Sequence, residues 1–284
     1  MRWKHGRRST NVENRQRVGG KTVAGGGGVF LVMAVAVFFL GGDPTPLIGE
    51  GIERTIQSKI EGQSQLSEEE NKELVDFVSV VLASTEDIWA QKFEKTGQQY
   101  PRPKLVLFTG RVQSACGLAG SATGPFYCPP DQKIYIDLSF YNDLKNKMNA
   151  PGDFAQAYVI AHEVGHHIQN ITGVIPKVTQ MKRRASKKQA NALQVRVELQ
   201  ADCYSGVWAK SVQDDYNMIE VGDIDEALHA ASQIGDDRLQ KQAQGYVVPD
   251  SFTHGSSAQR MAWFKRGFRS GSVDSCDTFA TQNL

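Results

Sequence analysis

The sequence predicts an α+β protein in which a small sheet and several long helices follow one transmembrane helix. Three observations support this prediction: an uncharged apolar run follows a basic N-terminal segment, long stretches repeat apolar residues at helical spacing, and two short segments have the composition of strands. The chain of 284 residues is 40% hydrophobic, which allows a sizeable core. Its net charge of +1 argues against nucleic acid as a partner.

The N-terminal part predicts a membrane anchor. Residues 1–21 are basic and poor in large apolar residues, so we expect a disordered tail. Residues 22–42 carry no charge and are long enough to cross a bilayer as a helix. Because the basic residues lie only before this run, the tail is expected in the cytoplasm and the remainder outside. A cleaved signal peptide is the alternative, although no small-x-small cleavage site precedes DPTPLIG.

These features predict a single-pass protein of the cytoplasmic (inner) membrane. Residues 43–66 would be a linker, and residues 67–284 would form an extracytoplasmic or periplasmic domain. The cysteines agree with that location, because an even number outside the cytoplasm suggests disulfides. We favour Cys116–Cys128 and Cys203–Cys276, and the two other pairings stay open. A four-cysteine zinc site is a weak alternative because no C-x-x-C pair is present.

The domain divides into helices and strands in the following order. Ser67 and Glu70 have the spacing of a capping box, which begins a helix that ends at Gly97. The stretch IPKVTQMKRRASKK is expected to be a solvated basic connector. The other expected elements are strands at KLVLFTG and KIYIDLSF and helices at 151–169, 186–214, 223–244 and AQRMAWFKRGF.

A group of ionisable residues lies within one apolar helix, AYVIAHEVGHHIQNITG. His162 and His166 are four residues apart and therefore share a helix face, where two imidazoles can bind one Zn²⁺. Glu163 can reach a water on the metal without binding the metal itself. The alternative is a plain polar face, but the apolar flanks indicate burial, and buried imidazoles need partners. His167 points away and is expected near the rim of the site.

A second helix supplies candidates for the rest of the site. In VRVELQADCYSGVWA, Glu198 and Asp202 lie four apart on one face with apolar neighbours. Glu198 would be the third metal ligand, and Asp202 would accept the distal N–H of a metal-bound histidine. The alternative is a solvated acidic pair, which becomes less favoured when H-E-x-x-H is present in the same chain.

AHEVGHHIQN, ELQADCYSGVWA and DSFTHGSSAQRMAWF together resemble the bacterial neutral zinc metallopeptidase family, whose members are membrane-anchored gluzincin-type proteins. The resemblance extends from the basic tail to GSVDSC and implies a zincin-like fold with one zinc per chain. It implies His162, His166 and Glu198 as metal ligands and Glu163 as general base. THGSSAQR is similar to a segment of other gluzincins and makes His254 a candidate oxyanion donor, although Gly255 replaces a proline of that segment.

The predicted function is a membrane-anchored zinc endopeptidase that hydrolyses peptide bonds of extracytoplasmic proteins. Its partners would be protein or peptide substrates and the membrane. The loop 116–128 and the strand KIYID are candidates for a sheet edge that binds the substrate. The alternative function is a catalytically silent, zinc-binding membrane adaptor or chaperone. An intramembrane protease is disfavoured because the motif helix has no apolar run of spanning length.

Overall fold

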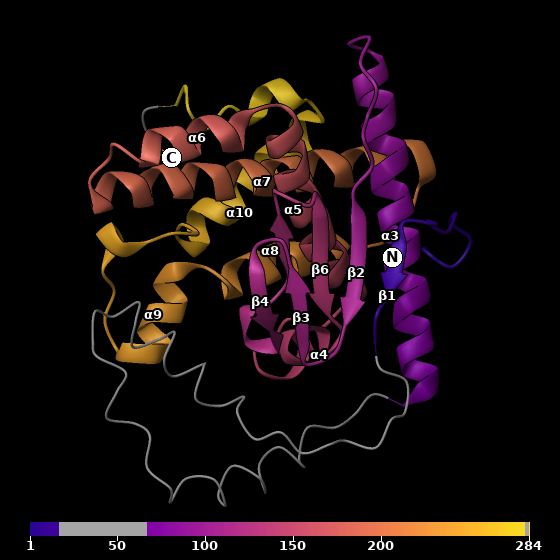
Figure 1. Cartoon of the computed structure of the whole chain (residues 1–284). Helices are drawn as coiled ribbons and strands as arrows, with labels where there is room; N and C mark the ends of the chain where they lie inside the picture. Colours follow the sequence, from indigo (N-terminus) through magenta and orange to yellow (C-terminus); the bar gives the residue numbers. More distant parts are fainter. Residues whose placement is uncertain (17–66, 282–283) are drawn as a thin grey trace, which may run out of the picture. The chain divides into compact units, whose positions relative to one another are not determined.

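The structure is a computed structural model that describes residues 1–16, 67–281 and 284 (Figure 1). Contacts divide the chain into two units, of which one combines residues 1–16 with 71–284 and the other is residues 17–70. The capping box at the start of α3 (Glu68–Glu94) is present, because Glu70 N donates to Ser67 Oγ over 3.2 Å and Ser67 N donates to Glu70 Oε2 over 2.9 Å. The remaining features belong to the first unit.

The main sheet has four strands in the order β1 (Val12–Asn14), β2 (Lys104–Phe108), β6 (Lys133–Asp137) and β5 (Phe126–Cys128). The first three strands are parallel, and β5 pairs antiparallel with β6 and forms one edge, opposite β1. A separate hairpin consists of β3 (Arg111–Ser114) and β4 (Gly117–Gly120). KLVLF and KIYID are rich in β-branched and aromatic residues, which pack well on a buried sheet.

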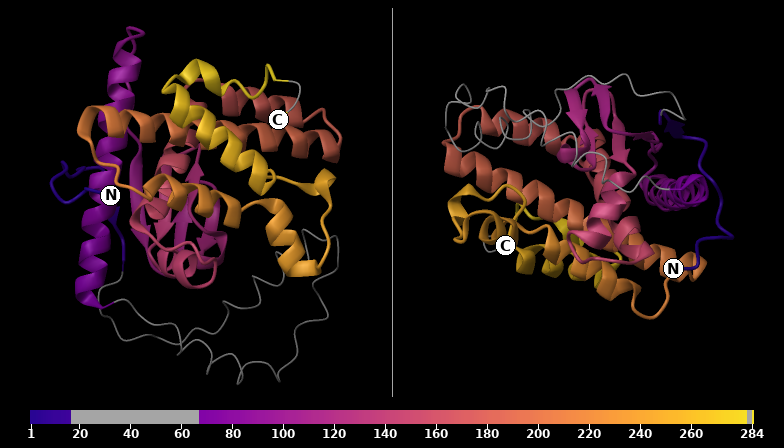
Figure 2. Two further views of the ribbon diagram at one scale, coloured as in Figure 1. Left: turned by 180° about the vertical axis from the view of Figure 1, so that it is seen from behind. Right: turned by 90° about the horizontal axis from the view of Figure 1, so that it is seen from below.

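Helices make up most of the remainder. Their bounds are α4 Ser139–Asn146, α5 Asp153–Ile171, α6 Val174–Lys182, α7 Lys187–Tyr216, α8 Asp223–Gln233, α9 Asp236–Gln244 and α10 Ser257–Ser270, with single 3₁₀ turns at Ser121–Thr123, Pro249–Ser251 and Val273–Cys276. Helix α5 contacts the sheet at β5 and β6 and also contacts α7, which in turn packs against α10 (Figure 2). This arrangement places α5 and α7, which carry the motif residues, side by side.

Glycines allow these helices to approach closely. A Cβ atom on Gly165, inside the H-E-x-x-H motif, would lie 3.1 Å from the backbone of Ala201 on α7. A Cβ atom on Gly267 of α10 would lie 2.0 Å from the carbonyl oxygen of Cys203, and one on Gly206 would lie 2.2 Å from that of Phe264. Glycine therefore sets the distance between α5 and α7 and between α7 and α10.

We expect Gly267→Ala to destabilise the protein by about 3 kcal/mol, because the added methyl group meets backbone that has no rotamer with which to move aside. Urea unfolding with the disulfides intact measures this loss. Gly120→Ala is the matched control, because its Cβ atom would lie 3.4 Å from its nearest neighbour and its φ of −128° suits any residue. Equal stability of the two variants would contradict this account of the α7–α10 contact.

Two predicted segments differ from the structure. The basic connector is wrong as an irregular linker, since residues 174–182 form helix α6, although five of the connector's six basic residues are exposed as expected. The single helix predicted over 223–244 is also wrong, because it breaks at Gly235 into α8 and α9. A side chain at Gly235 would clash with Ser257, whose backbone nitrogen would lie 2.4 Å from the added Cβ atom.

The prediction of a disordered basic tail is wrong for residues 1–16. This segment supplies strand β1, and its arginines pair with acidic residues of α3: Arg8 lies 2.6 Å from Asp76, and Arg7 lies 2.7 Å from Glu86. The α-amino group of Met1 lies 2.8 Å from the Asp153 carboxylate. The basic residues are thus explained by partners within the same unit.

The predicted membrane topology is also wrong, because it places residues 1–16 and the folded domain on opposite sides of a membrane. Residues 1–16 belong to one compact unit with residues 71–284, so a single membrane crossing cannot place them on opposite sides of a bilayer. The predicted transmembrane helix, residues 22–42, and the linker, residues 43–66, lie outside the described residues. Among residues 1–16 and 67–281, no helix combines the length and the apolarity needed to cross a bilayer.

Two disulfide bonds join Cys116 to Cys128 and Cys203 to Cys276, which are the pairings that the sequence favours. The first connects the β3–β4 turn to the edge strand β5. The second connects the middle of α7 to the C-terminal segment after α10. The helix that carries Glu198 and Asp202 is therefore covalently tied to the end of the domain.

Candidate metal centre and catalytic cleft

The three predicted ligands converge between α5 and α7. The Nε2 atom of His162 lies 3.3 Å from Oε2 of Glu198, and the Nε2 atom of His166 lies 3.5 Å from the same oxygen. One donor atom from each residue lies within 4.8 Å of the other two. All three side chains are nearly buried, with at most 13% of each exposed. Two nitrogens and one carboxylate oxygen are the donor set of many catalytic zinc sites.

The hydrogen bonds at Nδ1 direct the Nε2 atoms of both histidines toward Oε2 of Glu198, and Nε2 of His162 is within hydrogen-bond distance of that oxygen. Nδ1–H of His162 donates to Oδ1 of Asp202 over 2.9 Å, and Nδ1–H of His166 donates to Oε1 of Gln169 over 2.9 Å. The Gln169 amide must present its oxygen to His166, because its nitrogen donates to the carbonyl of Val197. With Nδ1 engaged in this way, each imidazole would bind a metal through Nε2 in its neutral form, and the donor set fits a divalent zinc ion.

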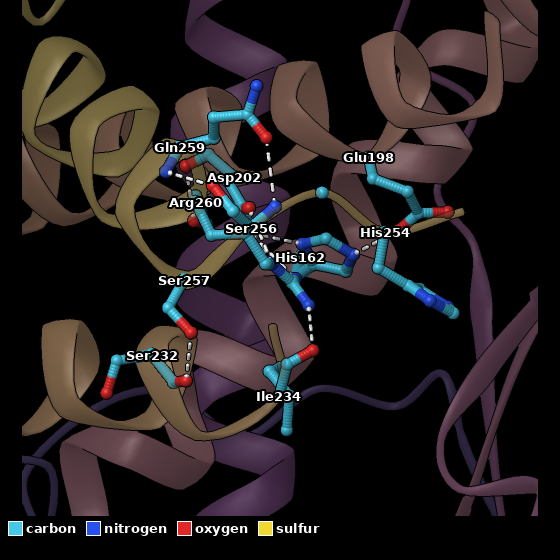
Figure 3. A network of polar contacts seen from close by, with 12 residues as sticks. His162, Glu198, Asp202, Ser232, Ile234, His254, Ser256, Ser257, Gln259 and Arg260 are labelled. Atoms are coloured by element: carbon cyan, nitrogen blue, oxygen red, sulfur yellow. Dashed lines mark hydrogen bonds and ion pairs between the residues drawn. The ribbon is translucent and has the colours of Figure 1, made fainter. Parts of the chain in front are cut away.

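Asp202 is the centre of a buried polar network (Figure 3). Its carboxylate accepts hydrogen bonds from Tyr158 Oη over 2.6 Å and from Arg260 Nε and Nη2 over 2.9 and 3.0 Å, in addition to His162. Burial by itself would raise the pKa of Asp202, but the charges of Arg260 and His162 lower it to about 2. The carboxylate is therefore ionised and holds the His162 ring in one orientation.

Glu163 lies next to this group and lines the same cleft. Its side chain has no hydrogen-bond or ion-pair partner among residues 1–16 and 67–281, although the residue is only 7% exposed. The carboxylate oxygens are open to the cleft, because neither belongs to the fully buried polar atoms that lack a hydrogen-bond partner. Glu163 is thus available to exchange a proton with a molecule that binds in the cleft.

The third ligand residue is also held in place. Gln194, one turn earlier on α7, donates from Nε2 to Oε1 of Glu198 over 2.7 Å, and its own amide oxygen accepts a hydrogen bond from Nζ of Lys182. Because Oε1 is engaged in this way, Oε2 of Glu198 is the oxygen that faces the two histidines.

His254 lines the cleft close to Glu198, from the loop before α10 (Figure 3). Asp236 at the start of α9 holds this loop, since Oδ2 accepts hydrogen bonds from the backbone nitrogens of Thr253, His254 and Gly255 over 2.6–3.0 Å. Nδ1 of His254 lies 3.2 Å from Oδ1 of Asp236. Burial would lower the pKa of His254, but the hydrogen bond to Asp236 raises it above its ordinary value.

The prediction that His167 lies near the rim is wrong. It is fully buried, and its Nε2–H donates to the carbonyl of Pro101 over 2.6 Å, so its Nδ1 accepts from Tyr127 Oη over 3.0 Å. Burial lowers its pKa to about 4, so it stays neutral. His167 therefore links helix α5 to strand β5.

The cleft has a volume of about 480 Å³, which suits a peptide segment or another small ligand. Its walls include Phe126 and Tyr127 of the edge strand β5. The strand KIYID was one candidate for this edge, but it is β6, which pairs on both sides. Strand β5, at the end of the cysteine loop, is the strand that has a free edge beside the cleft.

The supporting residues Gln169, Gln194 and Asp236 were not identified from the sequence. Gln169 follows His166 by three positions and Gln194 precedes Glu198 by four, so helical spacing places each beside its partner. That signal is weak, because glutamine is common on helix surfaces. Asp236 carries no local signal, since its contact with His254 depends on how α9 packs.

Comparison with known proteins agrees with this geometry. A family model described as "Putative neutral zinc metallopeptidase" matches residues 1–279. The chain belongs to this family. It is 51% identical to "Uncharacterized protein YpfJ" of Escherichia coli K12, over 98% of this chain and 99% of that protein. It is 43% identical to "Uncharacterized protein Rv2575" of Mycobacterium tuberculosis, over 65% of each chain. No solved structure matches the chain.

Proposed function

We propose that the protein is a zinc-dependent endopeptidase that hydrolyses peptide bonds of proteins or peptides, with one zinc per chain. The observation that carries this proposal is the convergence of His162, His166 and Glu198 beside an unpaired Glu163 in one cleft. Family membership agrees with a zinc peptidase. Neither it nor the cleft favours the silent adaptor, which would have no use for a carboxylate that lines the cleft without a partner among the described residues.

The three ligand residues would hold the zinc, which supplies Lewis acidity and lowers the pKa of a water molecule that it binds. The carboxylate of Glu163 then takes a proton from the attacking water and passes it to the nitrogen of the leaving amine. His254 presents its Nε2–H to the oxygen that becomes negatively charged, because Nδ1 is held by Asp236. Asp236 orients His254, and Asp202 orients His162.

An extended substrate can bind by adding a strand to β5. This strand is an edge of the sheet, lines the cleft and is attached to α5 through Tyr127 and His167. Backbone hydrogen bonds along β5 would align a peptide of almost any sequence, since they do not involve side chains. The direction of the peptide and its scissile bond would then follow from the position of the strand relative to the histidines.

The test is cleavage of a broad peptide library by purified protein that has been loaded with zinc. We expect cleavage at internal bonds, its loss after dialysis against a chelator, and its return when zinc is added back. A protein that binds zinc and leaves every peptide in the library intact would contradict the proposal and favour the adaptor function.

A further inference from the structure

One face of α6 forms a wall of the cleft. Ile175, Val178, Thr179 and Lys182 all line it, and their spacing places them on a single side of the helix. The wall is apolar at the beginning of α6 and cationic at its end. Lys182 therefore differs in its surroundings from the other basic residues of this segment. Those residues are all exposed: Lys177, Arg183, Arg184, Lys187 and Lys188.

The ammonium group of Lys182 differs from the other positive charges of the cleft. Arg260 forms its ion pair with Asp202 at 2.9 Å, and His254 lies 3.2 Å from Asp236. Among the described residues, Lys182 has no carboxylate within ion-pair distance, and its hydrogen bond goes to the neutral amide of Gln194. The side chain is half-buried, so part of its hydration is lost without a compensating anion.

The position of this charge is close to the reacting centre. The amide of Gln194 contacts both Nζ of Lys182 and Oε1 of Glu198, so a single amide group separates the ammonium from a metal ligand. Glu198 attracts Lys182 at a distance, but a bound zinc ion would engage that carboxylate. Lys182 then offers a positive charge to the ligand in the cleft.

We propose that Lys182 is a specificity-determining residue that binds a carboxylate of the substrate, from an Asp or Glu side chain or from the C-terminus of a peptide, close to the scissile bond. This inference rests on the proposed peptidase function. A hydrogen bond between an ammonium and a carboxylate is roughly twice as strong as one between neutral groups, which suffices for selection among peptides.

The competing role for Lys182 is purely structural. It would hold Gln194, and through Gln194 it would orient Glu198. In that case replacement of Lys182 would weaken zinc binding and would affect every peptide equally. The ratio of the affinities for two peptides separates the two roles. A structural defect weakens the binding of both peptides equally and therefore leaves their ratio unchanged.

The experiment measures peptide binding to zinc-loaded protein in the Glu163→Gln background, where bound peptides stay intact. One neutral fluorescent peptide is varied so that a single Glu, Gln or Lys occupies each position in turn, with the C-terminus either amidated or free. We expect the best Glu peptide or the free C-terminus to bind about tenfold more tightly than its Gln or amidated counterpart. The two arms distinguish a side-chain carboxylate from a terminal one.

Variants of Lys182 provide the decisive comparison. Lys182→Met should bring that ratio close to unity with zinc content retained, and Lys182→Glu should reverse it in favour of the Lys peptide. Lys177→Met, an exposed lysine of the same helix, should keep the ratio of the parent protein. Equal binding of all peptides by the parent protein, or an unchanged ratio in Lys182→Met, would overturn the inference.

The same peptides given to the protein with Glu163 intact separate this inference from the proposed function. Cleavage without preference for a carboxylate would refute the role of Lys182 and leave the peptidase standing. Binding that depends on a carboxylate and on Lys182, without any cleavage, would support the anion subsite and refute the peptidase.

Discussion

Replacing Glu163 with glutamine is expected to lower kcat/KM for peptide hydrolysis by about 10²- to 10⁴-fold, the usual contribution of a positioned general base. Glutamine keeps the shape of the side chain but cannot take a proton from the attacking water. Zinc content and thermal stability should remain close to those of the unmodified protein, because Glu163 has no hydrogen-bond partner among the described residues and is not one of the three converging ligands.

The matched control is Glu94→Gln, the same substitution at an exposed position near the end of α3. It should leave kcat/KM unchanged. Initial rates on a cleaved library peptide, with zinc measured in the same samples, provide the comparison. If Glu163→Gln cleaves as fast as the unmodified protein, Glu163 is not the base and the proposed mechanism is wrong.

Arg260→Met is expected to destabilise the protein by about 3–5 kcal/mol, because removing one member of a buried ion pair leaves the other charge without compensation. Arg260 is 3% exposed and Asp202 is fully buried. The variant should also bind zinc about tenfold to a hundredfold more weakly, since Asp202 orients His162. Chemical unfolding and a zinc competition titration measure the two effects.

The pH dependence of stability should change in the same variant. Because the folded-state pKa of Asp202 is lowered to about 2, its ionised form adds stability above the ordinary aspartate pKa. This stabilisation is lost as the pH falls from the ordinary aspartate pKa toward the folded-state pKa of about 2. Without Arg260 the pKa of Asp202 rises, so stability should decline less over this acidic range.

Arg269→Met, at an exposed position of the same helix, is the control and should change stability by no more than about 0.5 kcal/mol. Equal effects of the two substitutions would show that the buried network around Asp202 does not stabilise the domain. A loss of stability without any change in zinc affinity would instead show that Asp202 orients His162 without help from Arg260.

The part of the site that the sequence predicts is the part encoded by short helical spacings. His162 and His166 on α5, and Glu198 and Asp202 on α7, each lie four residues apart, and a helix converts that spacing into a shared face. The proximity of α5 and α7 depends on Gly165, and that of α7 and α10 depends on Gly267. Neither glycine can be recognised as a contact point before the packing is known. The partners of Asp202 and His254 follow from the same packing.

The errors at the N-terminus and in α6 have a common cause. Basic residues in both segments were interpreted as solvent-facing, but Arg7 and Arg8 pair with acidic residues of α3. In the α6 segment one of the six basic residues, Lys182, lines the cleft, and the other five are exposed. Charge composition shows that a segment needs counter-charges or water, and it does not show which of the two it finds. For Arg7 and Arg8, contacts with residues more than sixty positions away decide that question.

The most direct test of the proposed metal centre is the zinc content of the purified protein by elemental analysis, compared among single variants. We predict one zinc per chain in the unmodified protein and almost none in His162→Ala or Glu198→Ala. His229→Ala should retain the metal, because this exposed histidine donates to the carbonyl of Asn149 on another surface. Absence of zinc from the unmodified protein, or its full retention in both ligand variants, would contradict the account.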